Sequence, residues 1–401
     1  MIRRAARLRS MPAYPFARWD EVCKQAKGQG IDVLRLDLGV TDLMPPREIL
    51  KSFRRYSMKR PHHRSSSRVE EADFRKSVAE YYGRRFSVAL DPDTQVVPLL
   101  GTKEGIAHLS LGLLDPENRV LVPDPGYAAY SSGALLAGGI VKYYPLERER
   151  GYTPNLDLIP TRASEKASMM WLNYPNSPTG ATAGLEIFSE IIEFARLNDI
   201  LVCHDALYSD IAYRGYRPPS LLQVPNASEV AIEFNSLSKT FNMAGWRIGF
   251  AVGNPDALES LRRIKSYVDS GLPDPLIASA VAALSTEEEW ISTRNAEYEE
   301  RLGMLREGLR SIGIQSTMPQ ATPYLWCDLP LGQGSWLFAK DLLKDAGIAV
   351  APGVLFGVGG EGRIRVSATS SRSRIDQAIE RIQRLPAGWP RHKNHADRIS
   401  G

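Results

Sequence analysis

The chain has few cysteines, no long apolar run and almost no excess of charge. Its 401 residues include three cysteines that stand far apart and form no CxxC pair. This spacing excludes a disulfide scaffold and a cysteine-ligated zinc site, and it favours a reducing compartment. No apolar run approaches the ~20 residues of a membrane helix. The 50 basic and 46 acidic residues leave +4, too weak a bias to indicate nucleic acid binding. We therefore expect a cytoplasmic protein with neither a membrane nor a nucleic acid partner.

Short apolar runs alternate with amphipathic stretches through the middle of the chain. Six runs are typical of buried strands, at 95–100, 119–122, 168–172, 200–203, 229–234 and 248–252. Between them lie helical patterns such as 185–197, with apolar residues three and four apart. Strands that alternate with helices predict an α/β fold, in which helices cover both faces of a mostly parallel sheet.

The C-terminal part has a different pattern, with a long charged helix expected at 287–311. Shorter helices and strands follow it, which predicts a second, smaller α+β domain that residues 34–39 join. We therefore divide the chain into three parts. Residues 1–50 form an N-terminal arm and part of the small domain, 51–289 the large domain, and 290–401 the rest of the small domain.

The most informative stretch is 235–250, NSLSKTFNMAGWRIGF. It places Lys239 beside two serines, Ser236 and Ser238, directly after an expected buried strand, and Arg247 follows eight residues later. Burial at a strand end lowers the pKa of a lysine and makes its amine a nucleophile towards carbonyls. The hydroxyls and Arg247 could together hold a dianion such as a phosphate. An isolated lysine in a turn is most often a surface residue, so this interpretation depends on other segments.

Four further polar segments each follow an expected strand: GTKEG at 101–105, DPGY at 124–127, NYPNSPTG at 173–180 and HDALYSD at 204–210. Asp205 could pair with a protonated heterocycle nitrogen, Tyr208 could bond a phenolic oxygen, and Tyr127 could stack on a flat ring. Gly101 and Thr102 stand at an expected helix N-terminus, whose free N–H groups suit a phosphate. Because ligands gather beyond the carboxyl ends of parallel strands, these segments and the lysine predict one site.

These segments, together with RIRVSAT at 363–369, resemble the signature sequences of fold-type I pyridoxal-phosphate enzymes, the class I/II aminotransferases. The resemblance extends from about residue 34 to 385. Within the family, VVPLLGTKEGIAHL and GYRPPS are similar to the bacterial LL-diaminopimelate aminotransferase-like group. It implies pyridoxal 5'-phosphate as cofactor, no metal, and a homodimer whose sites are shared across the subunit interface.

The resemblance also implies a role for each matching residue. Lys239 would form a Schiff base with the cofactor and then move the proton at the substrate Cα. Asp205 would pair with the pyridine nitrogen, Tyr208 and Ser177 would lie at the phenolic oxygen, and Tyr127 would stack on the ring. The residues around the phosphate would be Gly101, Thr102, Lys103, Ser236, Ser238 and Arg247. On the substrate side, Arg365 would clamp an α-carboxylate, with Gly39 and Asn176 beside it.

Three places depart from the family pattern. Ser177 stands where the family has an Asn that contacts the phenolic oxygen. The segment 51–68, KSFRRYSMKRPHHRSSSR, has seven basic residues and no acid, and it lacks the family's tyrosine and glycine near its end. This segment is either a solvated loop or a basic wall for an anionic substrate at the neighbouring subunit's site. The loop 267–275 also differs from the family, where it borders the substrate pocket.

These observations favour an enzyme that transfers an amino group between an α-amino acid and a 2-oxo acid. The departures leave an alternative open, in which the same cofactor supports elimination, replacement, cyclisation or carbon–carbon bond formation, with an anionic or nucleotide-like co-substrate. A third class comprises transcription regulators with an aminotransferase-like domain. They need an N-terminal DNA-binding domain, for which the stretch before residue 34 is too short.

Overall fold

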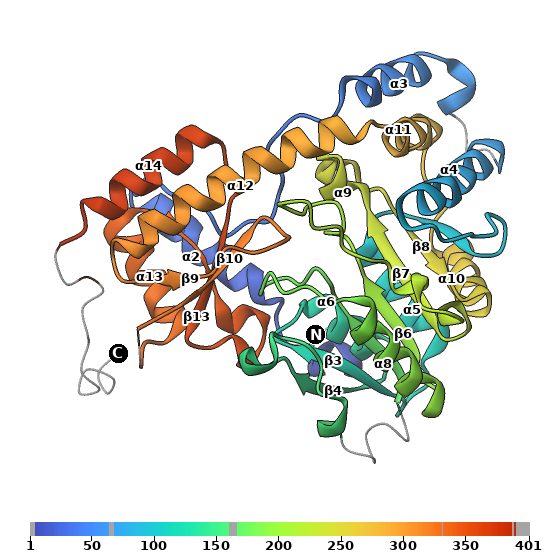
Figure 1. The fold of residues 1–401 in the computed structure, drawn as a ribbon, viewed down its shortest axis with the longest axis horizontal. Helices are drawn as coiled ribbons and strands as arrows, with labels where there is room; N and C mark the ends of the chain where they lie inside the picture. The colour runs from blue at the N-terminus through green and yellow to red at the C-terminus, as the bar shows by residue number, and fades with distance from the viewer. Residues whose placement is uncertain (1–4, 64–67, 160–166, 331, 387–388, 390–401) are drawn as a thin grey trace.

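A seven-stranded sheet forms the centre of the larger domain in the computed structural model, which describes residues 5–63, 68–159, 167–330, 332–386 and 389 (Figure 1). In spatial order its strands are β2 (Val96–Leu99), β8 (Gly249–Gly253), β7 (Ala231–Ser236), β6 (Leu201–Asp205), β5 (Ala167–Leu172), β3 (Arg119–Asp124) and β4 (Ile140–Pro145). The strands from β7 to β4 pair in parallel, whereas β8 runs antiparallel to both β2 and β7. The sheet is therefore mostly parallel, as the sequence predicted.

The connection from β7 to β8 lies at the end of the sheet where the parallel strands finish. Because the two strands are antiparallel, the chain leaves the sheet at Ser236 and re-enters it at Gly249, which is the residue paired with Ser236. The short helix α9 (Leu237–Thr240) lies in this connection. This is also the edge at which β6 ends with Asp205, so the signature segments meet here.

The six predicted strands correspond to β2, β3, β5, β6, β7 and β8, with ends that differ by at most two residues. The prediction missed β4, which lies at the edge of the sheet. Ile140 and Tyr143 in this strand are 41% and 60% exposed. An edge strand that faces solvent has no need of a continuous apolar run, so its sequence gives a weak signal.

Helices cover both faces of the sheet. One face carries α5 (Thr102–Leu113), α6 (Ala128–Leu136) and α10 (Pro255–Val268), which share a buried cluster with alternate strand residues such as Val97 and Met169. The other face carries α4 (Arg68–Phe86), α8 (Leu185–Leu197) and α11 (Asp274–Leu284), packed on the strand neighbours Val96 and Met170. The alternation follows from the two-residue period of a strand.

The smaller domain is built on an antiparallel sheet. Its strands in spatial order are β12 (Ala351–Pro352), β13 (Arg363–Ser367), β10 (Tyr324–Asp328) and β9 (Gln315–Ser316). The helices α2 (Pro15–Gly28), α13 (Ser335–Ala346) and α14 (Arg372–Gln383) share its core. The strand β1 (Leu34–Arg35) pairs in parallel with β11 (Ile348–Ala349), so the start of the chain lies beside its C-terminal part.

One long helix, α12 (Glu288–Arg310), runs from the end of α11 in the large domain into the small domain (Figure 1). The domain bounds at 50 and 289 stay a prediction. No helix in the described part of the chain combines the length and apolarity that a membrane span requires.

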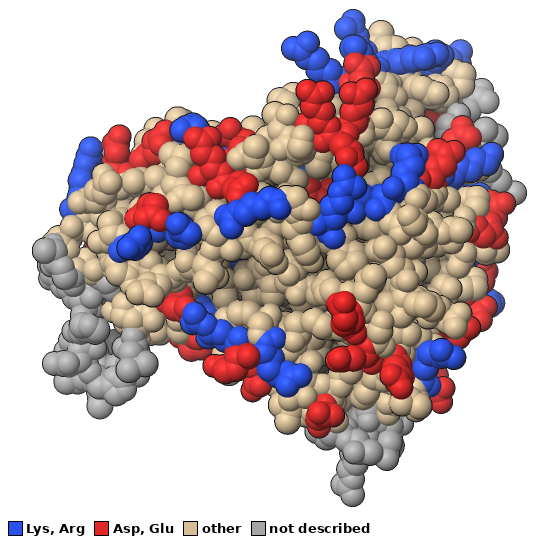
Figure 2. Space-filling view, viewed as in Figure 1, with Lys and Arg blue, Asp and Glu red and all other residues tan. Residues whose placement is uncertain are grey.

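The basic segment 51–68 begins inside α3 (Arg47–Ser57), which packs on α11. A short 3-10 turn, Arg60–His63, follows, and residues 64–67 lie outside the described residues. Figure 2 shows basic side chains gathered at the top of the view, where Figure 1 places α3. The exposed ones in this segment include Lys51, Arg54, Arg55, Lys59 and Arg60. The short helix α1 (Ala6–Ser10) precedes α2 near the N-terminus.

Candidate active site

A cavity of about 540 Å³ lies at the edge of the large sheet where β6 and β7 end. The predicted residues that line it are Gly39, Thr102, Lys103, Tyr127, Ser177, Asp205, Tyr208, Ser236, Ser238, Lys239, Arg247 and Arg365. They come from both domains and from positions up to 326 residues apart, between Gly39 and Arg365. The structure therefore brings together almost all of the residues that the motifs singled out.

Lys239 lies on α9, just after β7 ends. Its Nζ donates a hydrogen bond to the carbonyl oxygen of Gly39, from the segment that follows β1. Burial lowers the pKa of this lysine, and the nearby cations Arg365 and Arg247 lower it further. A lower pKa increases the fraction of neutral amine, which is the form that can attack a carbonyl carbon.

Asp205 is fully buried at the end of β6. Its Oδ2 accepts a hydrogen bond of 2.8 Å from the hydroxyl of Tyr130, whereas its Oδ1 is buried without a partner among the described residues. Burial raises the pKa of this carboxyl to about 7, against the opposing effect of the Tyr130 hydrogen bond. A buried acceptor of this kind calls for a donor from a bound group, because an unsatisfied polar atom is costly.

Arg247 lies against the backbone at Gly101. Gly101 has a φ of +86°, and a Cβ at this position would lie 2.4 Å from Nη2 of Arg247. The guanidinium therefore lies against the backbone at the point where α5 begins with Thr102. Ser238 adds a buried hydroxyl oxygen that has no partner among the described residues. A helix N-terminus, a guanidinium and free hydroxyls are the donors that a phosphate requires.

Arg365 reaches the cavity from β13 of the small domain and is only 6% exposed. Its Nη1 donates to Ser177 Oγ at 3.1 Å and its Nη2 donates to the carbonyl oxygen of Asp37 at 2.9 Å. Its guanidinium lies 4.2 Å from the ring centre of Tyr324. Within the described residues no carboxylate forms an ion pair with it, and its Nε is unpartnered. A buried cation in this state suits a ligand carboxylate.

A pair of tyrosines connects the two domains beside the cavity that holds Lys239. The hydroxyls of Tyr208 and Tyr324 lie 2.8 Å apart and share a hydrogen bond. Tyr324 also lies against Gly39, where a Cβ would come within 2.1 Å of its hydroxyl oxygen. The backbone at Gly39 can therefore approach the lysine only because it carries no side chain.

Two predicted residues do not line the cavity. Gly101 acts through its backbone, as described above. Asn176 was predicted on the substrate side, but its side chain is fully buried within its own turn. Its Nδ2 donates to the carbonyl oxygen of Asn173 at 3.1 Å, and its Oδ1 accepts from the hydroxyl of Thr179 at 2.7 Å. Both polar groups of Asn176 thus have partners within the Pro-rich turn, and the structure does not bring this side chain together with the other predicted substrate residues.

Sequence reasoning also missed residues that line the cavity. Tyr14 and Phe16 reach it from the N-terminal arm, before the region that carries the family resemblance. Asn173 opens the turn, and its Nδ2 donates to the carbonyl oxygen of Asp205 at 2.6 Å. The sequence could have predicted Tyr130, because it stands three residues after Tyr127 and so lies on the same side of the helix that begins there.

The comparison with known families decides the class of protein. A family model described as aminotransferase class I and II matches residues 31–382. The chain belongs to this family. One relative is the LL-diaminopimelate aminotransferase of Moorella thermoacetica, 43% identical over 381 residues that cover 95% of this chain and 98% of that protein. A second, from Desulforudis audaxviator, has the same name and is 43% identical over 379 residues, 94% of this chain and 97% of that protein.

Solved structures agree with this assignment. BacF from Bacillus subtilis superposes with a TM-score of 0.90 at 31% identity, over 96% of this chain and 98% of that chain. A probable N-succinyldiaminopimelate aminotransferase from Thermus thermophilus gives a TM-score of 0.87 at 34% identity, over 92% and 99%. The protein is a pyridoxal-phosphate-dependent aminotransferase of fold type I, and the comparisons do not favour the non-transaminating alternative.

The residues of the cavity fit pyridoxal 5'-phosphate. The unpartnered Oδ1 of Asp205 offers an acceptor for a protonated ring nitrogen, and the group of donors beside Arg247 suits a phosphate. Lys239 lies in the same cavity and has an amine of lowered pKa. The unpartnered Arg365 Nε remains for a substrate carboxylate.

Proposed function

We propose that this aminotransferase takes its amino group from an α-amino acid with a long polar side chain, LL-diaminopimelate, and passes it to a 2-oxo acid. The observation that carries this substrate assignment is the 43% identity to LL-diaminopimelate aminotransferases over 95% of the chain. Arg365 also supports an α-amino acid as substrate, because its buried guanidinium lines the cavity and can bind an α-carboxylate.

We assign the chemical step to Lys239. When bound, pyridoxal phosphate supplies an aldehyde that condenses with amines and a ring that withdraws electrons from the substrate Cα. Lys239 Nζ would hold the cofactor, and the same amine would serve as the base that accepts the proton from the substrate Cα. Burial lowers the pKa of this lysine, which increases the fraction of amine that is neutral and able to accept that proton.

The surrounding residues hold and orient the reacting groups. Asp205 Oδ1 would keep the ring nitrogen protonated, while Tyr130 fixes the carboxylate by donating to Oδ2. Tyr208 and Ser177 would contact the phenolic oxygen, and Tyr127 would stack on the ring. Gly101, Thr102, Lys103, Ser236, Ser238 and Arg247 would hold the phosphate. Arg365 binds the α-carboxylate close to Gly39, whose carbonyl oxygen accepts from Lys239.

We also propose that the enzyme acts as a homodimer in the cytoplasm. The family resemblance implies that the segment 51–68 and the loop 267–275 meet the partner subunit. Exposed apolar side chains in both segments support a subunit interface here, since Met58 is 80% and Tyr267 is 83% exposed. In that arrangement the basic side chains of α3 would face the neighbouring site and attract an anionic substrate.

A half-reaction tests the assignment of donor and reaction. The holoenzyme is mixed with LL-diaminopimelate, glutamate or arginine without any 2-oxo acid, and the cofactor absorbance is followed. We expect LL-diaminopimelate to convert the cofactor completely to its pyridoxamine form, and 2-oxoglutarate to reverse the change. Conversion by glutamate or arginine but not by LL-diaminopimelate would overturn the donor assignment.

A further inference from the structure

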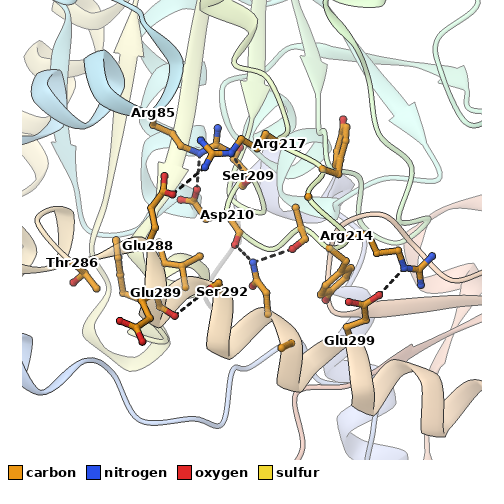
Figure 3. Close-up of a pocket in the computed structure, with 18 of the residues that line it drawn as sticks. Arg85, Ser209, Asp210, Arg214, Arg217, Thr286, Glu288, Glu289, Ser292 and Glu299 are labelled. Carbon is orange, nitrogen blue, oxygen red and sulfur yellow. Dashed lines mark hydrogen bonds and ion pairs between the residues drawn. The ribbon is translucent and has the colours of Figure 1, made fainter.

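A second cavity has a volume of about 630 Å³, and Figure 3 shows the residues that line it. It is open to solvent on one side and is lined by the C-terminal half of α4, the segment 209–217 after β6, and the first turns of α12. It shares no lining residue with the active-site cavity. Three of the segments that resemble the family reach this cavity, at 209–210, 215–217 and Phe241, but none of these residues has a part in the proposed reaction.

Charges of both signs line this cavity in equal number. The basic residues are Arg84, Arg85, Arg214 and Arg217, and the acidic ones are Asp210, Glu288, Glu289 and Glu299. The formal charge of the lining is therefore zero, although the charges are separated in space. Such a lining favours neither a polyanion nor a polycation, because either would leave half of the charges facing a like charge.

Two of the ion pairs connect α12 to the large domain across the cavity. Arg217 Nη2 lies 3.0 Å from Glu288 Oε2, and Arg214 Nε lies 2.7 Å from Glu299 Oε1 (Figure 3). The side chains of Arg217 and Glu288 are 66% and 76% exposed. Exposed pairs of this kind contribute little to stability, so a ligand can separate them at small cost.

The floor of the cavity is preorganised and partly apolar. Asp210 is held by the hydroxyl of Tyr81 at 2.5 Å and by Arg85 Nε at 3.1 Å. The buried side chains of Phe241 and Leu284 lie beside these polar groups. A site with a few fixed polar groups and apolar walls is typical of small-molecule binding.

We propose that this cavity is a regulatory site for a zwitterionic amino acid. The ligand carboxylate pairs with Arg217, its ammonium group pairs with Glu288, and its side chain packs on Phe241 and Leu284. The ligand thus replaces one exposed ion pair by two, and it ties the first turn of α12 to the segment 209–217. This inference goes beyond the proposed donor and does not depend on it.

The cavity is connected to the catalytic lysine by one pair of side chains. Asn295 Nδ2 donates to the carbonyl oxygens of Asp210 and Ala212, both at 3.0 Å. The neighbouring Arg294, which is 2% exposed, donates through Nη2 to Asp210 O at 2.5 Å and through Nη1 to Lys239 O at 2.7 Å. The floor of the cavity, α12 and the backbone of the lysine therefore meet at a single buried guanidinium.

The expected effect is inhibition of turnover. Because α12 continues into the small domain, a ligand that fixes its first turn restrains the movement of that domain over the active site. The amino acid should then lower kcat without competing with the donor. Binding at the active site would instead raise the KM for the donor and leave kcat unchanged.

The test uses the holoenzyme and a panel of the common L-amino acids. Each is added at millimolar concentration with saturating 2-oxo acid and with the donor varied up to saturation, the donor being any amino acid that converts the cofactor. Ser292→Trp fills the cavity from the exposed side of α12, and Thr293→Trp, one residue on and outside the lining, is the matched control. Titration calorimetry on the same proteins, and on Arg217→Gln, measures binding directly.

We expect at least one amino acid to lower kcat twofold or more in the wild type and in Thr293→Trp, and to have no effect on Ser292→Trp. Its affinity should fall about three- to fivefold in Arg217→Gln, because the ligand carboxylate loses its charged partner at an exposed position. Two results would overturn the proposal. In one, every inhibitory amino acid competes with the donor and acts equally on Ser292→Trp. In the other, no amino acid lowers kcat and the panel gives no heat of binding. Since any active donor serves, failure of LL-diaminopimelate as donor leaves this test intact.

Discussion

Arg365 Nη1 donates a hydrogen bond to Ser177 Oγ across the boundary between the two domains, at 3.1 Å. Ser177 comes from the turn after β5, and Arg365 from β13 of the small domain. The serine that replaces the usual asparagine of the family therefore orients the guanidinium that we assign to the substrate carboxylate. This contact gives the departure at residue 177 a structural role.

Ser177→Ala should weaken substrate binding more than it slows the chemical step. Loss of a hydrogen bond to a charged group should raise the KM for the amino acid about tenfold and leave kcat within about threefold. Steady-state kinetics measure both constants. Ser189→Ala, at an exposed position on α8, serves as control and should behave as the wild type. Equal kinetics for the two variants would show that Ser177 does not position Arg365.

Arg365→Lys should be far more damaging, although it keeps the charge. A lysine cannot offer the planar pair of N–H groups that binds a carboxylate through both oxygens, so kcat/KM should fall by about 100-fold or more. The neighbouring Arg363→Lys is the control, because Arg363 pairs with Asp328 instead of facing the cavity. A loss of similar size in both variants would contradict the assignment of the carboxylate site.

Cofactor affinity of the apoenzyme should increase with pH through the titration of Asp205. Burial raises the pKa of this carboxyl to about 7, so below that pH it is protonated and cannot form an ion pair with the ring nitrogen. As the pH rises from 6 to 8, the Kd for pyridoxal phosphate should fall by about tenfold, as the ionised fraction rises. Fluorescence titration measures this Kd. Asp205→Asn should bind weakly at every pH, and a pH dependence that persists in this variant would assign the titration to another group.

Lys239→Ala should stop the proton transfer at the substrate Cα while the protein still folds. We expect the half-reaction to slow by at least about 10³-fold, since the variant lacks its general base. Added methylamine should restore part of the rate, because a small amine can enter the space that the side chain leaves. Absence of rescue together with an unchanged circular dichroism spectrum would argue against a direct role of the amine.

The oligomeric state has a direct test. Light scattering during size-exclusion chromatography should give twice the chain mass of 44.5 kDa. Reversal of charge on the exposed face of α3, as in Arg54→Glu with Arg55→Glu, should raise the KM for an anionic substrate if these side chains face the neighbouring site. A fully active species of single-chain mass would refute the homodimer.

The sequence predicted the parts of the fold and site that local patterns encode. The strands β6 and β7 are buried apolar runs, β6 ends with Asp205 and Lys239 follows β7. This pattern predicted both strands, and it predicted that the site lies where they end. The edge strand β4 was not, because Ile140 and Tyr143 face solvent and form no such pattern.

The remaining misses involve contacts between distant parts of the chain. Tyr14 and Phe16 line the active-site cavity only because the N-terminal arm returns to it. The sequence of Asn176 matched a binding turn, yet its side chain bonds within that turn. The second cavity was not predicted either, because it forms only where α4, the segment 209–217 and α12, which are distant in sequence, pack together.

The reversed direction of β8 has a consequence for how the site is assembled during folding. Because Ser236 and Gly249 are paired neighbours, Lys239 and Arg247 come together by closing a loop of about a dozen residues. Asp205 and Gly101 must be recruited over far longer stretches of chain, at a higher entropic cost of closure. Lys239 and the arginine that we assign to the phosphate therefore form a local unit, and we expect a refolding chain to form this half of the site before the domains dock.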